Sequence, residues 1–376
     1  MADHTDELLD ATTALIPPLL TGLEALAHAG RHLHPPALTE VVAGVAGFRA
    51  PLAEGLERFE AASWPEHLTT FREQSVAAAG HALQAFDELT DSLSRQNPVF
   101  AAYRALGHHT RAVEALYPVA FMLPPVNRFY LCQPERQDEA LQAALLAADP
   151  GREDVGVMHA DNGIAQRGGF SLYVPEYLAA AGQAPSGPAV AAQPSPLVVA
   201  LHGGSGHGRR FLWTWLREAR SRGAIVIAPT SREDTWSLNL PEADLANVQA
   251  MVEHVSSLWP VDRRRVLLTG MSDGGTFCWL AALSSDNPFT HFAPVSASFH
   301  PLLLEGADPG RLQGLPVYLV HGALDWMFPV DVARTAQQAL AAAGARVTYR
   351  ELDDLSHTYP REENLPMLDW LLATPA

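Results

Sequence analysis

The stretch "VLLTGMSDGGTFCWL", Val266 to Leu280, places a small polar residue between two apolar runs. The first run is typical of a buried strand and ends at Gly270, and the second begins after Gly274 with helical period. Ser272 therefore lies on a sharp turn, with glycine two residues before it and two after it. Side chains at those glycines would collide with the neighbouring strand and helix. Two interpretations fit: a glycine-rich turn whose serine caps the helix, or a turn that exposes a nucleophilic hydroxyl.

This strand, turn and helix belong to a longer alternation that begins near residue 154. Runs rich in Val, Leu and Ile, such as "PLVVALHGG", "AIVIAPT" and "PVYLVHG", alternate with helical segments. Runs that are apolar throughout indicate strands covered on both faces, so the sequence predicts a mostly parallel α/β sheet flanked by helices. The first two runs, "DVGVMHA" and "GFSLYVP", lack a helix between them and are expected to pair antiparallel at one edge. The stretch "AGQAPSGPAVAAQPSP", residues 181–196, is expected to be a surface loop.

The residues before this alternation have a different pattern. Apolar residues recur at helical spacing, and Pro17, Pro18 and Pro51 are expected to break or kink these helices. The sequence thus predicts a helical N-terminal domain over 1–148 and a catalytic α/β domain over 149–376. Nothing in the first domain has a catalytic spacing. It is expected to cover the substrate pocket or to join copies of the chain in a homo-oligomer.

Composition excludes several classes of chemistry. The 376 residues carry a net charge of −17, and all 25 basic residues are Arg. Without Lys, Schiff-base catalysis, Ser–Lys dyads and Lys-bearing phosphate loops are excluded. The absence of a long basic stretch argues against nucleic acid as a partner. No metal or other cofactor is expected.

Cysteine usage and the chain's start predict a location. Cys132 and Cys278 are far apart in the sequence, which indicates two buried thiols in a reducing compartment rather than a disulfide framework or zinc site. The opening "MADHTDELLD" lacks the basic region and apolar core of a secretion signal, and no apolar run is long enough to span a membrane. We expect a cytoplasmic protein without a membrane span.

A serine nucleophile needs a histidine base, and four histidines follow Ser272. His291 lies at the start of a predicted strand. His321 lies at the end of another strand and is expected to have a structural role there. His300 follows another strand and remains a candidate substrate contact. His357, in "DDLSHTYP", lies between the last strand and the last helix, at the carboxyl end of the sheet where a base would have to stand. His357 is therefore the predicted base.

The base in turn needs a carboxylate that fixes its tautomer. In "PVYLVHGALDWMFPVD", Asp325 lies in the loop after a strand, ahead of the next helix. Asp353 and Asp354 are too close in sequence to His357 to be preferred. Asp325 is the predicted acid, and an ordinary turn residue is the alternative.

An acyl-transfer site also needs two N–H groups aimed at the developing oxyanion. One is expected from Asp273, directly after the serine. The other is expected from "VVALHGGSGHG", where Gly203 and Gly204 let the backbone approach a substrate carbonyl. A phosphate-binding loop is the alternative, but the glycine spacing and the missing Lys do not match one.

At these residues the sequence resembles the α/β-hydrolase superfamily. It is most similar to the cytosolic carboxylesterase/phospholipase type and to polyhydroxyalkanoate-depolymerase-like serine esterases. The matching pieces are "FSLYVP", "LHGGSGHG", "GMSDGG", "HGALDWMFP" and "SHTYP", which together span roughly residues 154–376. The helical domain has no counterpart in this resemblance, and no cap domain is inserted between the later strands.

The resemblance implies hydrolysis of carboxylic esters through an acyl-enzyme, without a metal. It assigns Ser272, Asp325 and His357 to a catalytic triad, and the N–H groups of Gly204 and Asp273 to the oxyanion hole. Oligopeptidase, thioesterase and acyltransferase activities share the same acyl-enzyme and stay open. A non-catalytic binding protein is the alternative from another class.

Aromatic side chains near the predicted site indicate a small-molecule ester with an apolar or aromatic part. Trp236 and Trp326 are predicted to line the pocket together with Gly203. Trp213 and Trp215 either line it too or simply pack a helix.

Overall fold

The computed structural model describes residues 2–178, 194–284 and 287–374. The chain forms two compact units, Met1–Leu131 and Cys132–Ala376. Helix α7, Glu139–Ala147, is part of the second unit, although its helical period groups it with residues 1–148 in the sequence. Of the predicted surface loop, residues 181–193 lie outside the described residues.

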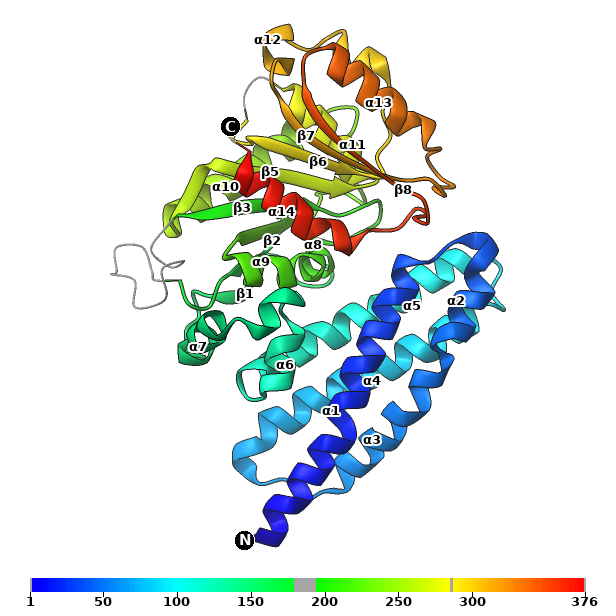
Figure 1. Ribbon diagram of the computed structural model, residues 1–376, viewed down its shortest axis with the longest axis vertical. Coiled ribbons are helices and arrows are strands. Elements are labelled where there is room, and N and C mark those ends of the chain that lie inside the picture. Colours follow the sequence, from blue (N-terminus) through cyan, green and yellow to red (C-terminus); the bar gives the residue numbers. More distant parts are fainter. Residues whose placement is uncertain (1, 179–193, 285–286, 375–376) are drawn as a thin grey trace. The chain divides into compact units, whose positions relative to one another are not determined.

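The first unit is built of helices, drawn blue to cyan in Figure 1. Its α-helices are α1 Ala2–Arg31, α2 Leu38–Val45, α3 Arg49–Ala61, α4 Thr69–Ser92, α5 Pro98–Leu116 and α6 Pro124–Phe129. A break or a kink was predicted at Pro17 and Pro18, and the break is wrong, because helix α1 continues through both prolines. Each proline removes one backbone N–H, but fully buried side chains such as Leu15 and Leu19 hold the helix in the core on both sides of the pair.

The second unit contains one eight-stranded sheet in the order β1-β2-β4-β3-β5-β6-β7-β8. The strands are β1 Gly156–Ala160, β2 Phe170–Val174, β3 Ser195–Leu201, β4 Ile225–Pro229, β5 Val261–Met271, β6 His291–Val295, β7 Pro316–Gly322 and β8 Arg346–Leu352. β1 pairs antiparallel with β2, and β2 pairs antiparallel with β4. All pairs from β4 to β8 are parallel. The predicted mostly parallel sheet with an antiparallel edge is confirmed.

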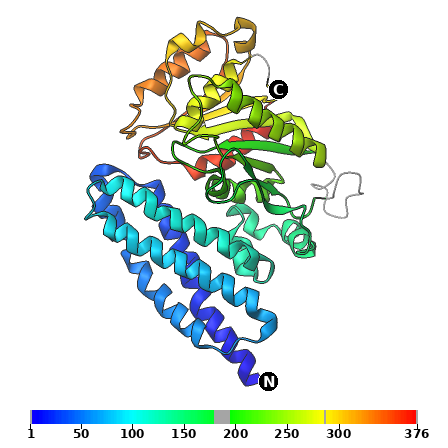
Figure 2. The ribbon, with the colours of Figure 1, turned by 180° about the vertical axis from the view of Figure 1, so that it is seen from behind.

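Helices cover both faces of this sheet, as the opposite views in Figures 1 and 2 show. α9 and α14 lie on one face, and α10 and α11 lie on the other. The helices of this unit after α7 are α8 Gly208–Phe211, α9 Leu216–Arg222, α10 Glu242–Leu258, α11 Asp273–Leu283, α12 Pro309–Leu312, α13 Asp331–Ala342 and α14 Asn364–Ala373. Every residue of the central strands β3, β4, β6 and β7 is buried, which explains why their sequences are apolar runs rather than alternating patterns.

This topology brings four loops together. β3, β5, β6 and β7 are parallel neighbours in the sheet, so their carboxyl ends lie at one edge. In parallel sheets this edge is where ligands bind. The loops that follow Leu201, Met271 and Gly322 carry the glycine-rich stretch, Ser272 and Asp325, and the fourth loop follows Val295 at the end of β6.

Both cysteines, Cys132 and Cys278, are buried free thiols. Burial raises the pKa of Cys132 to about 12, so the thiol stays protonated at neutral pH. Across the described ranges, every helix is too short or too polar to cross a bilayer.

Candidate active site

Ser272 occupies the turn between β5 and α11 in a conformation that serine rarely adopts. Its φ of 54° and ψ of −118° lie outside the regions favoured by L-residues, and such strain costs about 1–3 kcal/mol. A Cβ on Gly274 would lie 2.5 Å from the carbonyl oxygen of His202, and one on Gly270 would lie 2.5 Å from the backbone of Gly274. The Ser272 side chain makes no capping hydrogen bond to α11, which excludes the helix-cap interpretation. Its N–H donates to the Val295 carbonyl on β6 at 2.9 Å, which fixes the turn to the sheet.

Three side chains from distant parts of the sequence form one hydrogen-bonded chain. His357 Nε2 lies 3.1 Å from Ser272 Oγ, and His357 Nδ1 lies 2.8 Å from Asp325 Oδ2. A carboxylate only accepts hydrogen bonds, so Nδ1 carries the proton and Nε2 is left to accept from the serine hydroxyl. The three residues are buried, with 5–8% of their surfaces exposed. The predicted nucleophile, base and acid are therefore within mutual contact.

The carboxylate of Asp325 is held by its own loop. Oδ1 accepts from the N–H groups of Met327 at 2.9 Å and Phe328 at 2.8 Å. Burial by itself favours the protonated acid, but the hydrogen bonds from His357 and Phe328 outweigh it, so the pKa of Asp325 lies below its ordinary value. The group is consequently ionised at neutral pH and can stabilise a positive charge on His357.

Close backbone packing brings the acid loop and the base loop together. Ala323 and Leu324, just after β7, donate their N–H groups to the carbonyls of Leu352 and Leu355, both at 2.9 Å. A side chain on Gly322 would collide with the Leu355 carbonyl. Glycine at this position therefore lets the segment that leads to His357 cross the end of β7.

The two predicted oxyanion donors are available. In the described part of the chain, neither the Gly204 N–H nor the Asp273 N–H is hydrogen-bonded to a protein acceptor. A Cβ on Gly203 would lie 3.5 Å from the Ser272 Cβ, so the glycine-rich loop runs directly beside the serine. Unengaged N–H groups near a nucleophile are the arrangement that stabilises an oxyanion.

His202, which the sequence analysis did not assign, fixes the orientation of this loop. Its Nδ1 donates to the Gly203 carbonyl at 2.7 Å, and its Nε2 accepts from the Ser231 N–H at 3.1 Å. In a trans peptide the N–H points opposite to the carbonyl, so holding the Gly203 oxygen turns the Gly204 N–H away from His202. Burial lowers the pKa of His202 to about 4, which keeps the ring neutral. The sequence did offer one signal for His202: it is a polar residue directly after the buried strand β3.

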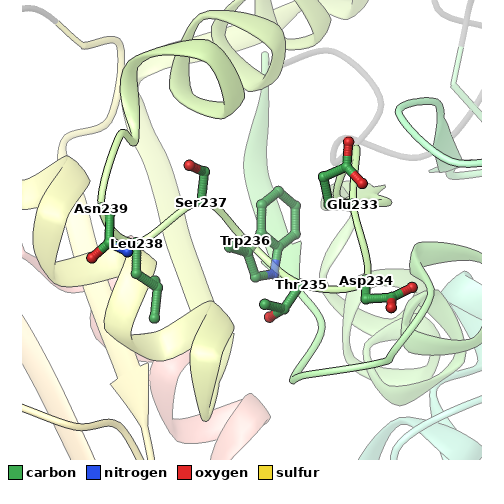
Figure 3. Close-up of a pocket in the computed structure, with 7 residues that line it drawn as sticks. All are labelled: Glu233, Asp234, Thr235, Trp236, Ser237, Leu238 and Asn239. Carbon is green, nitrogen blue, oxygen red and sulfur yellow. The ribbon is translucent and has the colours of Figure 1, made fainter.

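A pocket of about 460 Å³ lies beside the glycine-rich loop, lined by the segment Glu233–Asn239 between β4 and α10 (Figure 3). Thr235 donates its hydroxyl to Asp273 Oδ2 at 2.6 Å, and the Asp234 carbonyl accepts from the Ser205 N–H at 2.9 Å. The pocket therefore borders the residue that follows the serine. Polar residues outnumber apolar ones in this segment, but most of the lining surface is apolar. Of these residues, the sequence analysis had placed only Trp236 in a pocket.

The two tryptophans predicted to contact substrate differ in burial. Trp236 belongs to the pocket lining, but it is only 2% exposed and its Nε1 donates to the His202 carbonyl at 2.8 Å. Its main contacts thus support the glycine-rich loop. Trp326 is 40% exposed beside Asp325, flanked by Leu324 and Met327 with similar exposure.

Three other residues that the sequence analysis considered as possible substrate contacts have packing or capping roles instead. Trp213 and Trp215 are buried, so they pack the helical segment after β3. His300 is exposed and accepts from the Leu302 N–H at 3.2 Å, capping the short helix Pro301–Leu304. The described residues include no group of three or more His, Cys, Asp or Glu side chains that could hold a metal ion.

Comparison with known proteins agrees with this architecture. Residues 238–371 match the family model described as Phospholipase/Carboxylesterase. A bifunctional acetylxylan esterase/xylanase of Neocallimastix patriciarum is 28% identical over 180 residues, which is 45% of this chain and 25% of that protein. A probable feruloyl esterase C of Aspergillus oryzae is 28% identical over 134 residues, 35% of this chain and 47% of that protein. The chain spans less than half the length of these curated relatives.

Two solved structures show partial similarity to this fold. A thermostable esterase has a TM-score of 0.42 at 21% identity, over 60% of this chain and 64% of that one. The S-formylglutathione hydrolase of Staphylococcus aureus has a TM-score of 0.44 at 15% identity, over 57% of this chain and 95% of that one.

The sheet order and the strained turn after β5 are those of the α/β-hydrolase fold, and the match to the phospholipase/carboxylesterase model falls within this second unit, over residues 238–371. The resemblance drawn from the sequence motifs is confirmed at this level. These matches do not show the more specific resemblance to polyhydroxyalkanoate-depolymerase-like esterases. Both curated relatives are esterases by name, and the matched model is that of phospholipases and carboxylesterases.

Proposed function

We propose that this chain is a serine hydrolase that cleaves carboxylic esters through an acyl-enzyme. The observation that carries the proposal is the hydrogen-bonded chain from Asp325 through His357 to Ser272, set on a strained turn between a strand and a helix. A serine hydroxyl is a weak nucleophile unless a base takes its proton, and this geometry supplies both the base and its orienting acid.

In the first half-reaction, Ser272 Oγ attacks the ester carbonyl carbon while His357 Nε2 accepts the hydroxyl proton. The carbonyl oxygen becomes an oxyanion that accepts hydrogen bonds from the N–H groups of Asp273 and Gly204. The carbon–alkoxide bond then breaks, and the alcohol leaves with the proton from His357. Asp325 stabilises the imidazolium throughout without taking its proton.

In the second half-reaction, water replaces the alcohol. His357 accepts a proton from the water as it attacks the acyl carbon, and the second tetrahedral intermediate uses the same two N–H groups. The bond to Ser272 Oγ breaks, the serine regains its proton from His357, and the carboxylic acid leaves. No step requires a metal or another cofactor.

The proposed substrates are small to medium esters with an apolar or aromatic part. Leu324, Trp326 and Met327 support this proposal because they expose about 40% of their surfaces around Asp325. Two relatives are named for acetylxylan and feruloyl esters, so acetyl and feruloyl esters belong in the first substrate panel.

The test is Ser272→Ala. Turnover of p-nitrophenyl acetate and butyrate should fall by a factor on the order of 10⁴–10⁶, and labelling by a fluorophosphonate probe should disappear. Ser257→Ala is the matched control, because this exposed hydroxyl on α10 bonds only the His254 carbonyl. Full activity in Ser272→Ala, or an unlabelled wild-type protein, would contradict the proposal.

The same panel separates the alternative activities. A peptide anilide, an acyl thioester and an added alcohol acceptor report on oligopeptidase, thioesterase and acyltransferase activity. Faster turnover of one of these than of every ester would reassign the reaction while keeping the same nucleophile. A role for the helical unit as a cover or an oligomer interface, and a cytoplasmic location, remain predictions.

A further inference from the structure

A second imidazole, that of His321, lies beside Asp325. The ring is fully buried near the end of β7, with Nε2 2.8 Å from the Phe328 carbonyl oxygen and 3.6 Å from Asp325 Oδ2. A carbonyl only accepts, so the proton of His321 is on Nε2 and Nδ1 carries a lone pair. Within the described residues, this Nδ1 has no hydrogen-bond partner. A buried polar atom left unpaired costs free energy, so the fold alone does not account for an imidazole here.

Phe328, whose carbonyl His321 holds, contacts both the proposed acid and the proposed base. Phe328 donates its N–H to Asp325 Oδ1 at 2.8 Å. Its ring meets the His357 ring edge-on, with centroids 5.4 Å apart and planes at 80°. Movement of Phe328 would therefore disturb the carboxylate and the imidazole together.

We propose that His321 is a positioning residue. By holding the Phe328 carbonyl, it fixes the Asp325 carboxylate and the His357 ring in the orientation that proton transfer from Ser272 requires. The proposal rests on the function proposed above, and His321 acts through Phe328 without touching the substrate.

The charges around His321 are consistent with this role. Asp325, His357 and Glu351 are the titratable groups that face the ring. Burial lowers the pKa of His321, so the ring is neutral at neutral pH and does not compete with His357 for the Asp325 charge. Glu351 is paired with Arg334 at 2.6 Å, which satisfies that carboxylate elsewhere.

Two substitutions separate positioning from packing. His321→Gln keeps an N–H donor near the position of Nε2, whereas His321→Leu fills the site without a donor. We expect His321→Leu to lower kcat/KM for p-nitrophenyl esters about 10–100-fold, as loss of a group that supports a site residue does. His321→Gln should recover most of that loss. Equal losses in both variants, with a lower melting temperature and an unchanged pH profile, would mean that the ring only packs and would overturn the proposal.

A double-mutant cycle tests whether His321 affects activity through Asp325. If His321 acts through Asp325, adding His321→Leu to Asp325→Asn should cost little further activity, because the orientation is already lost. The same fold-loss in both backgrounds would show an effect independent of Asp325 and would also overturn the proposal.

A spectroscopic readout keeps this result separate from the proposed activity. The His357 Nδ1–H bonded to Asp325 should give a low-field proton resonance in wild type and in His321→Gln, and the resonance should broaden or shift in His321→Leu. An unchanged resonance in His321→Leu contradicts the positioning role, whether or not the wild-type protein hydrolyses esters. Absence of ester turnover in wild type with the expected resonance changes contradicts the proposed function alone.

Discussion

The turn that carries Ser272 and the loops that carry Asp325 and His357 are held by different forces. The turn is specified by steric exclusion: Gly270 and Gly274 flank the serine, and close contacts with the turn itself and with the end of β3 at Leu201 and His202 exclude a side chain at either glycine. The acid and base loops are held by hydrogen bonds between segments far apart in the sequence. Substitutions of the two turn glycines should therefore damage folding, whereas those in the acid and base loops should damage chemistry and leave the fold intact.

Within the acid and base loops, the largest effect is expected at Asp325. Asp325→Asn leaves the side-chain volume unchanged but removes the charge and favours the wrong tautomer of His357, so kcat should fall about 10³–10⁴-fold. The far-ultraviolet circular dichroism spectrum should be unchanged. Asp331→Asn is the control, because that carboxylate is 83% exposed and bonds Arg334. A fall of less than tenfold at Asp325 would remove it from the mechanism.

A smaller effect, on stability, is expected in the turn itself. Gly274→Ala would place a Cβ 2.5 Å from the His202 carbonyl oxygen, where only backbone can move aside. Such overpacking should lower the free energy of unfolding by about 3 kcal/mol, measured by urea denaturation. Gly80→Ala in α4 is the control, since a Cβ there meets no atom within 4 Å and alanine favours the helix. Unchanged stability in Gly274→Ala would show that the turn is not sterically specified.

His202, in the glycine-rich loop beside the Ser272 turn, should make the stability of the protein depend on pH. His202 has a pKa of about 4 in the folded protein against an ordinary 6.5, so between these values the unfolded chain binds more protons than the folded one. Stability should fall as pH drops from 6.5 to 4, and His202 should contribute about 3 kcal/mol to that fall. His202→Asn should flatten the dependence measured by denaturation at several pH values, and the exposed His67→Gln should leave it unchanged. Equal slopes in wild type and His202→Asn would contradict this account.

The smallest effect is expected at the rim of the acid loop. Trp326 is 40% exposed, so Trp326→Ala should leave the fold intact. It should raise KM for a long-chain or aromatic ester about tenfold, in keeping with the loss of apolar contact, and change KM for an acetate ester little. Leu146→Ala is the control, because this side chain in α7 is also exposed to solvent, at 65% of its surface. A change of the same size for both esters would argue against an apolar contact at Trp326.

The sequence by itself determined the alternating strands and helices, the turn at Ser272 and the choice of His357 and Asp325. These features depend on short-range rules: apolar runs for buried strands, glycine where backbones touch, and polar residues where strands end. They can be read within a few residues, without knowing what lies opposite.

Only the tertiary structure decided the rest. Helix α1 continues through Pro17 and Pro18 because its buried side chains hold it, and Trp236 supports a loop because the ring is covered by residues distant in sequence. The contacts of His202 and His321 likewise depend on which loops meet at the sheet's edge. Burial and hydrogen-bond partners are properties of the folded chain, so no local pattern specifies them.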